Sequence, residues 1–267
     1  MENDHLDARL ALAISQAVNA CDELAQGNML SERTLTGALL GSLKTSLAIH
    51  ATQDFQLGWS IYNEGPEHND YSEAATGVDF GLVVVLKSGL IRFAAFQAKR
   101  PNDVGRTQIR ANQTRGEHPN QISQLITLRD ASTQLMNNAK DRNNTTLKDL
   151  RWVHYLAYSN PITCVQLARM QKQVDAESTV PGSSSSFDAI DIGIEFSAVI
   201  MSAVFARSKY WLNIGSLRGF SQLPPFFSQM PIALIAGRPL GMAPGAFLRS
   251  LLTFSPKPAS KLKPSLS

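Results

Sequence analysis

The chain has 267 residues, of which 43% are hydrophobic and 18% are charged, a composition typical of a folded globular protein rather than a disordered one. Its two cysteines, Cys21 and Cys164, form neither a CxxC pair nor a Cys/His cluster, so a disulfide scaffold and a structural zinc site are not expected. The acidic N-terminus differs from a signal peptide, and the apolar stretch 190–206 is shorter than the ~20 residues that a membrane span needs. We therefore expect a cytoplasmic protein that does not contact a membrane.

The net charge of +3 is unevenly distributed along the chain. Residues 1–76 hold eleven acidic and three basic residues, a net charge of −8, so the rest of the chain carries +11. Residues 87–129 alone contain eight basic residues against two acidic ones. This asymmetry is compatible with a polyanion bound over the middle of the chain, although a solvated basic loop is the ordinary alternative.

Two amphipathic helices and then three strands are expected in the first hundred residues. Apolar residues at helical spacing predict a helix over 4–26, and a leucine at every fourth position predicts another over 31–49, with Ser31 as its N-cap. Alternating apolar and polar residues predict a strand over 54–63. Two β-branched or aromatic runs, 76–86 and 91–101, separated by a glycine-containing turn, predict a β-hairpin.

The rest of the chain alternates between helical, strand-like and loop-like segments. The expected ranges are a polar loop or loosely held helix over 101–120, a helix over 121–139, an aromatic strand over 152–158, a helix over 162–173, a serine-rich loop over 178–186 and an apolar segment packed on the same core over 187–214. A mixed central β-sheet flanked by helices, in the α/β class, is the simplest way to bury these faces.

The hairpin brings three chemically useful side chains together at one end. Because alternate residues of a strand share a face, Gln97 and Lys99 point the same way, and Asp79 lies beside them if the strands pair. A buried acid, amide and lysine need partners or a ligand. Mg²⁺ prefers carboxylate and carbonyl oxygens, and a neighbouring lysine can hold a phosphate oxygen or help to activate a water. This combination indicates phosphodiester hydrolysis.

Asp79, followed 18 residues later by Gln97-Ala98-Lys99, resembles the D-x(n)-(D/E/Q)-x-K signature of the PD-(D/E)XK, restriction-endonuclease-like nucleases, in the variant with Gln in place of an acid. A preceding helix with Glu32 and a following helix with Gln121 and Gln124 agree in order with this family. The resemblance covers about residues 30–160. It implies a restriction-endonuclease-like core of four mixed strands with flanking helices, metal at Asp79 and Gln97, and Lys99 beside the scissile phosphate.

The glutamine removes one negative charge from the expected metal site, so a second carboxylate is wanted. Glu73, six residues before Asp79, is one candidate, and its alternative reading is a solvated loop acid. Glu32 is the other, although an acid in the first turn of a helix is also explained by the helix dipole.

Further residues are candidates for holding nucleic acid. Gln121 and Gln124 could reach Lys99 or a phosphate from the helix after the hairpin, although a polar role on the helix surface is equally open. Basic side chains near the hairpin could hold the DNA backbone, or could simply be surface residues: Arg100, Arg106, Arg110 and Arg115.

These observations predict a Mg²⁺-dependent DNA endonuclease, with Mn²⁺ as a substitute, resembling uncharacterised bacterial members of defence type. The alternatives are a non-catalytic nucleic-acid-binding or assembly module on the same fold and a polymorphic toxin nuclease. The chain has no GxxxxGK[ST] loop, so any sensor or ATPase would be a separate chain, and self-association stays open. The expected organisation is a nuclease core over 1–175, a serine-rich linker over 176–187, a C-terminal extension that packs on the core or forms an interface over 188–254, and a disordered basic tail over 255–267.

Overall fold

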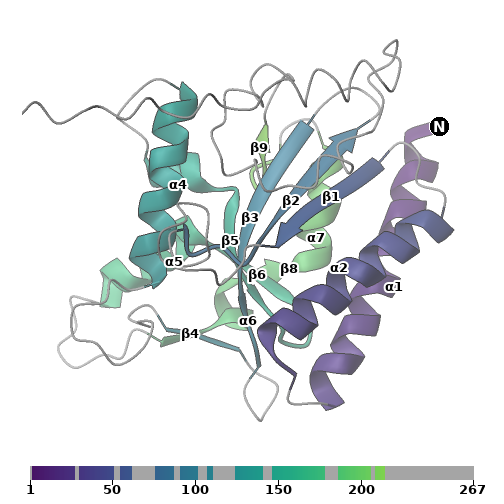
Figure 1. Cartoon of the computed structure of the whole chain (residues 1–267), viewed down its shortest axis with the longest axis horizontal. Helices are drawn as coiled ribbons and strands as arrows, with labels where there is room; N and C mark the ends of the chain where they lie inside the picture. Colours follow the sequence, from purple (N-terminus) through teal and green to yellow (C-terminus); the bar gives the residue numbers. More distant parts are fainter. Residues whose placement is uncertain are drawn as a thin grey trace, which may run out of the picture.

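A mixed seven-stranded sheet forms the centre of the computed structural model and lies between two layers of helices (Figure 1). The structure describes residues 2–27, 30–50, 55–61, 76–86, 91–101, 107–110, 124–140, 146–177, 186–205 and 208–213. The strands run in the order β1-β2-β3-β5-β6-β8, with β9 beside β3, and only the β3–β5 pair is parallel within this sheet. Their bounds are β1 Phe55–Ile61, β2 Phe80–Leu86, β3 Ile91–Lys99, β5 Val153–Ala157, β6 Thr163–Gln166, β8 Ile194–Glu195 and β9 Leu212–Asn213.

The two helical layers bury separate apolar clusters against the two faces of the sheet. One layer consists of α1 Glu2–Gly27, α2 Glu32–Ile49, α7 Phe196–Met201 and the short 3₁₀ helix η2 Ser202–Val204. The other consists of α4 Gln124–Lys140, η1 Leu147–Leu150, α5 Leu167–Glu177 and α6 Ala189–Ile192. A separate two-stranded sheet pairs β4 Gln108–Arg110 with β7 Ser186–Asp188 on the second side.

Local sequence signals account for the N-terminal helices and the hairpin. The apolar stripes of α1 and α2 are buried against each other and the sheet, and Ser31 Oγ accepts the Thr34 N–H at 3.1 Å as the predicted N-cap. In the hairpin, residues such as Phe80 and Phe96 face α1 and α2, whereas Phe93 and Ala95 face the α4 and α5 side. The period of two therefore sends alternate side chains of β3 into different cores.

The predicted helices over 4–26, 31–49 and 121–139, the hairpin and the strand over 152–158 are confirmed in the residues described. The helix predicted over 162–173 is wrong at its start, because residues 163–166 form β6 and pair with β5. The loop or loose helix predicted over 101–120 contains strand β4, held by its pairing with β7. Both errors concern strands of three or four residues, which are too short to show an alternation of apolar and polar residues.

Residues 186–205 and 208–213 pack on the central architecture rather than lying apart from it. Within the predicted apolar segment, β8 pairs with β6, β9 pairs with β3, and Phe196, Val199 and Trp211 are buried in the α1–α2 core. Most of the predicted serine-rich loop, residues 178–185, and all of 214–267 lie outside the described residues.

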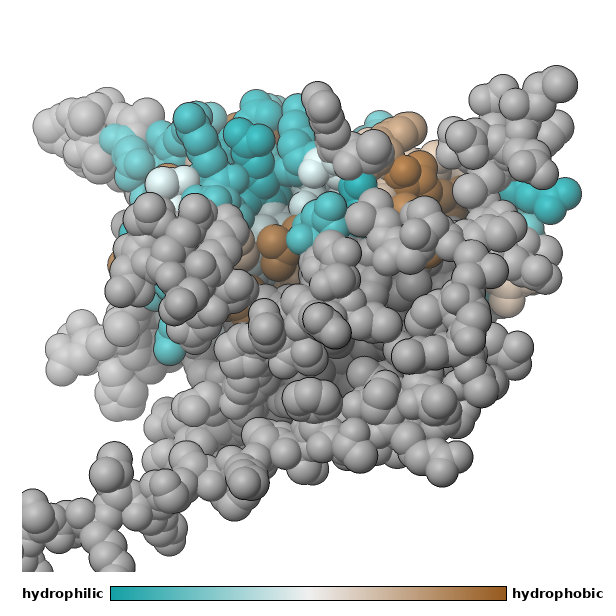
Figure 2. Space-filling model, turned by 90° about the horizontal axis from the view of Figure 1, so that it is seen from above, coloured by the Kyte–Doolittle hydropathy of each residue, from teal (hydrophilic) through white to brown (hydrophobic). Residues whose placement is uncertain are grey.

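Hydrophilic residues cover most of the described surface seen from above, with smaller apolar areas between them (Figure 2). In the part of the chain that the structure describes, no helix has the length and apolar character needed to cross a membrane.

Asp22 connects α1 to the turn between β5 and β6. Its carboxylate accepts a hydrogen bond from the backbone N–H of Ile162, but its Oδ1 is buried and has no partner within the described residues. Burial raises the pKa of Asp22 from 3.8 to about 6, and the hydrogen bond from Ile162 offsets only part of this shift. The folded state therefore favours the protonated carboxyl, and the ionised form costs stability as the pH rises from 3.8 through about 6.

We expect Asp22→Asn to be more stable than the wild type above pH 6 and equal to it below pH 4, because the amide removes the buried charge and can still accept the Ile162 N–H. Urea unfolding from pH 4 to pH 8 measures the difference. His154, whose pKa burial lowers to about 4, titrates in both proteins and cancels in the comparison. A difference that does not change with pH would contradict the expectation.

Candidate functional site

The three side chains of the hairpin motif converge where β3 ends, between the first turn of α2 and the start of α4. Figure 1 shows the sheet with α4 and α5 on one side and α1 and α2 on the other. Lys99, the last residue of β3, pairs with Ala157 of the parallel strand β5. This end of β3 is therefore reached from both helical layers.

Asp79 is fixed against β3 by its backbone and its side chain. Its N–H donates to Phe96 O at 2.9 Å, and its Oδ2 accepts from Gln97 Nε2 at 2.7 Å and from the backbone N–H of Ala98. Hydrogen bonds to an ionised carboxylate are among the stronger ones. The carboxylate of Asp79 is therefore held directly beside the amide of Gln97.

Gln97 carries a buried oxygen that the site leaves unsatisfied. The residue is 2% exposed, its Nε2 bonds Asp79, and its Oε1 has no hydrogen-bond partner in the part of the chain that is described. An unpaired buried acceptor costs about 1–3 kcal/mol. This oxygen is therefore available to a ligand, and a cation is one that would satisfy it.

Lys99 is buried at the same end of β3, with 6% of its surface exposed. Its ammonium donates to Gln124 Oε1 at 2.8 Å, so α4 holds the lysine through a neutral amide. Gln124 thus contacts Lys99, which is one of the two alternatives that the sequence left open for it.

Glu32 reaches the site from α2. Its Oε1 accepts the backbone N–H of Arg100, the residue after β3, at 3.2 Å. The Ser31 cap fixes the turn that carries Glu32. The carboxylate of Glu32 therefore lies at the end of the strand that bears Gln97 and Lys99.

Tyr158 bonds both the backbone of Lys99 and α2, and it was not among the expected site residues. It is 1% exposed, its N–H donates to Lys99 O at 2.9 Å, and its hydroxyl donates to Thr36 Oγ1 at 2.8 Å. Burial raises the pKa of Tyr158 well above its usual value, the hydrogen bond to Thr36 lowers it in part, and the charges of Cys21, Asp79 and Glu32 raise it further. Tyr158 therefore connects the end of β3 to α2.

Gly77 sets the approach of α4 to the strand that carries Asp79. Its φ of 68° lies in the left-handed region, and a Cβ there would be 3.1 Å from the backbone nitrogen of Leu128. Leu128 is one helical turn after Gln124, so the absence of a side chain at Gly77 allows α4 to pack close to the site.

The structure thus brings together Asp79, Gln97, Lys99, Gln124 and Glu32, and it adds Tyr158 and Thr36. Arg100 is exposed beside the site, and only the backbone of Arg110 is described, in β4. The remaining candidates lie outside the described residues: Glu73, Arg106, Arg115 and Gln121. Thr36 has one sequence signal, its i+4 spacing from Glu32, but nothing local pairs it with Tyr158.

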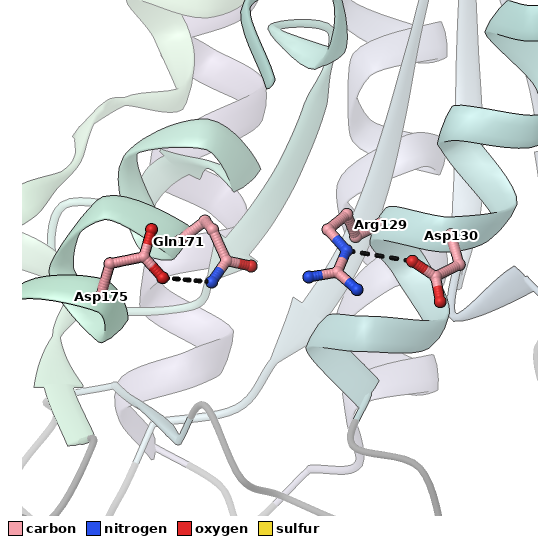
Figure 3. Close-up of polar contacts among 4 residues, drawn as sticks. All are labelled: Arg129, Asp130, Gln171 and Asp175. Carbon is pink, nitrogen blue, oxygen red and sulfur yellow. Dashed lines mark hydrogen bonds and ion pairs between the residues drawn. The ribbon is translucent and has the colours of Figure 1, made fainter. Parts of the chain in front are cut away.

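Polar pairs on α4 and α5 provide a contrast with the site (Figure 3). Arg129 Nε bonds Asp130 Oδ1 at 3.0 Å, with side chains 36% and 62% exposed, and Gln171 Nε2 bonds Asp175 Oδ1 at 2.9 Å. The Arg129–Asp130 pair is exposed, and pairs of this kind contribute little to stability. Gln171 Oε1, like Gln97 Oε1, is buried and has no hydrogen-bond partner within the described residues. Both pairs offer matched controls for substitutions within the site.

We expect Gly77→Ala to destabilise the protein by about 1–3 kcal/mol, because alanine is strained at this φ and its methyl group would press on the α4 backbone. Gly41→Ala is the control, since a Cβ at this position in α2 meets nothing within 4 Å and should stabilise by about 0.5–1 kcal/mol. Urea unfolding of both variants measures the effects. Equal stability of the two variants would show that Gly77 does not set the position of α4.

Among the described residues, no cluster of three or more His, Cys, Asp or Glu side chains could hold a metal ion. The donors at the end of β3 are instead a carboxylate and an amide oxygen, with Glu32 nearby. Searches of protein-family models and of curated proteins find no match to this chain. Any assignment of function therefore depends on the chemistry of these side chains.

Proposed function

We propose that the protein is a metal-dependent endonuclease that hydrolyses the phosphodiester bonds of DNA, acting as an effector of a bacterial anti-phage or restriction system. The observation that carries the proposal is the convergence of Asp79, Gln97 and Lys99 at the end of β3, with the buried oxygen of Gln97 left unpaired. The role in defence depends on the sequence resemblance alone.

The order of elements around the site supports the proposal. The sequence resemblance implies four mixed strands flanked by helices, one of which carries an acid. Strands β1, β2, β3 and β5 lie side by side, α2 with Glu32 precedes them, and α4 with Gln124 connects β3 to the parallel β5. This order is the one expected for a restriction-endonuclease-like core.

The donors at the end of β3 are compatible with a hard divalent cation. Asp79 offers a carboxylate, Gln97 an amide oxygen and β3 its backbone carbonyls, all oxygen ligands of the kind that Mg²⁺ prefers. The amide of Gln97 now presents its nitrogen to Asp79. Turning the amide over would direct its oxygen and that of Asp79 to one cation, and it would place Nε2 where the unpaired Oε1 now lies.

The remaining groups fit the chemistry of phosphodiester hydrolysis. Bound Mg²⁺ would supply Lewis-acid polarisation of the phosphate and acidify a water. The ammonium of Lys99 would bind a phosphate oxygen and stabilise the charge that develops during hydrolysis. Gln124 would hold Lys99 in position until the phosphate arrives, because its oxygen already accepts from the ammonium.

A second carboxylate would compensate for the neutral Gln97. Glu32 is the candidate within the described residues, because its Oε1 accepts the Arg100 N–H at the end of β3. Glu73 is the alternative.

The charge distribution supports a nucleic-acid substrate. Arg100 is exposed immediately after Lys99, and residues 87–129 are basic overall. Phosphate contacts of this type bind with little sequence preference and weaken as salt concentration rises.

A non-catalytic nucleic-acid-binding module is the second candidate. It is favoured by the fact that Gln97 Nε2 and the Ala98 N–H already satisfy Asp79 Oδ2 without a cation. Such a module would bind DNA in a salt-dependent manner with no metal requirement.

We expect the wild type to cleave plasmid DNA with Mg²⁺ or Mn²⁺, alone or with its natural partner chains. Asp79→Asn and Lys99→Met should each lower the rate by about a hundredfold or more, because each removes a charge that acts on the phosphate or the cation. Gel assays of supercoiled, linear and single-stranded DNA measure the rates.

Asp130→Asn is the matched control for this assay, because it removes an exposed carboxylate from α4 and should leave cleavage unchanged. The nuclease proposal would be contradicted if the wild type and Asp79→Asn both bound DNA but neither cleaved it under any of these conditions. That result would favour the binding module.

Gln97→Glu tests the cation site without DNA. Two carboxylates at this distance repel each other in the absence of a cation, so the variant should melt at a lower temperature than the wild type in EDTA. Mg²⁺ or Mn²⁺ should then stabilise the variant more than it stabilises the wild type. The free energy of unfolding of the variant should rise by about 2.7 kcal/mol at a metal concentration 100 times its Kd. Gln171→Glu places the same pair of groups beside Asp175 on α5 and should gain no such stabilisation. Equal metal responses of the two variants would refute the cation site.

A further inference from the structure

Four hydrogen bonds form a closed ring around the peptide unit between Lys99 and Arg100. The carbonyl of this unit accepts the Tyr158 N–H at 2.9 Å, and its N–H donates to Glu32 Oε1 at 3.2 Å. Tyr158 and Glu32 are themselves connected through Thr36, which accepts from the Tyr158 hydroxyl at 2.8 Å and donates to the Glu32 carbonyl at 2.8 Å. One peptide unit is therefore held on both sides by a single connected set of residues.

The ring constrains groups that act in the proposed reaction. Because the peptide unit is planar and its C=O and N–H point in opposite directions, fixing both fixes its orientation at the end of β3. That orientation determines where the Lys99 side chain starts and where the carboxylate of Glu32 lies. Tyr158 and Thr36 are 1% and 2% exposed, so water does not compete readily for their hydrogen bond.

We propose that Tyr158, acting through Thr36, is a positioning residue that holds Glu32, with its carboxylate on the Arg100 N–H, at the end of β3 and so sets the affinity of this site for a divalent cation. The inference rests on the proposed function of the site. It assigns the second carboxylate to Glu32, and it gives the buried hydroxyl a role that neither ordinary packing nor β5 pairing requires.

Loss of the hydrogen bond between Tyr158 and Thr36 should weaken cation binding while leaving the fold in place. Tyr158→Phe and Thr36→Val each break the ring, and we expect each to raise the dissociation constant for Mn²⁺ about tenfold, as is typical when a group that orients a ligand is lost. Thr36→Ser keeps the hydroxyl and should bind Mn²⁺ as the wild type does. The half-saturating Mg²⁺ concentration for DNA cleavage should rise by the same factor, and kcat should recover at high Mg²⁺.

Thr45→Val is the matched control, because Thr45 makes the same i to i−4 bond to a helix carbonyl, at 3.0 Å, on the exposed side of α2. Calorimetric titration of the full chain with Mn²⁺, and melting temperatures of every variant, separate cation affinity from stability. If the Tyr158→Phe variant melts at a lower temperature but binds Mn²⁺ with unchanged affinity, Tyr158 has a structural role only and the inference is overturned. A wild type that binds no Mn²⁺ would overturn the proposed cation site and the inference together.

Discussion

The parallel pairing of β3 with β5 is the constraint on which the candidate site depends. Adjacent parallel strands need a crossover, and α4 provides it by running back along the sheet, so its first turn lies near the end where β3 finishes. Gln124 consequently meets Lys99 there. The same pairing places Tyr158 immediately beyond Ala157, where its N–H meets the carbonyl of Lys99 and its ring turns toward α2.

The burial of β3 explains why an amide at residue 97 is compatible with a stable protein. Residues 92–99 are all buried, so each polar side chain needs a partner to offset the cost of leaving water. An amide can donate to Asp79, whereas a carboxylate in its place would repel Asp79 until a cation arrived. Gln97 therefore provides a partner for Asp79 without adding a second buried charge, and its Oε1 has no hydrogen-bond partner within the described residues.

Both helical layers contribute to the site, so its geometry depends on the whole core. On one side, Gly77 permits close approach of α4. On the other, α2 packs against α1, and α1 is itself bonded through Asp22 to Ile162, just after the turn that follows Tyr158. Loss of packing in either layer would move the groups at the end of β3 relative to one another.

Local sequence patterns were enough to predict the long periodic elements and the side chains that share a face. Helical spacing defined α1 and α2, and the period of two placed Gln97 and Lys99 on one side of β3 because that period is a local property of extended backbone. The short strands β4 and β6 were not evident, since three or four residues show no clear period and are held by pairing with distant segments. Only the tertiary structure brought Tyr158 to Thr36, 122 residues earlier in the chain, because no local pattern encodes a contact made by packing a helix on a sheet.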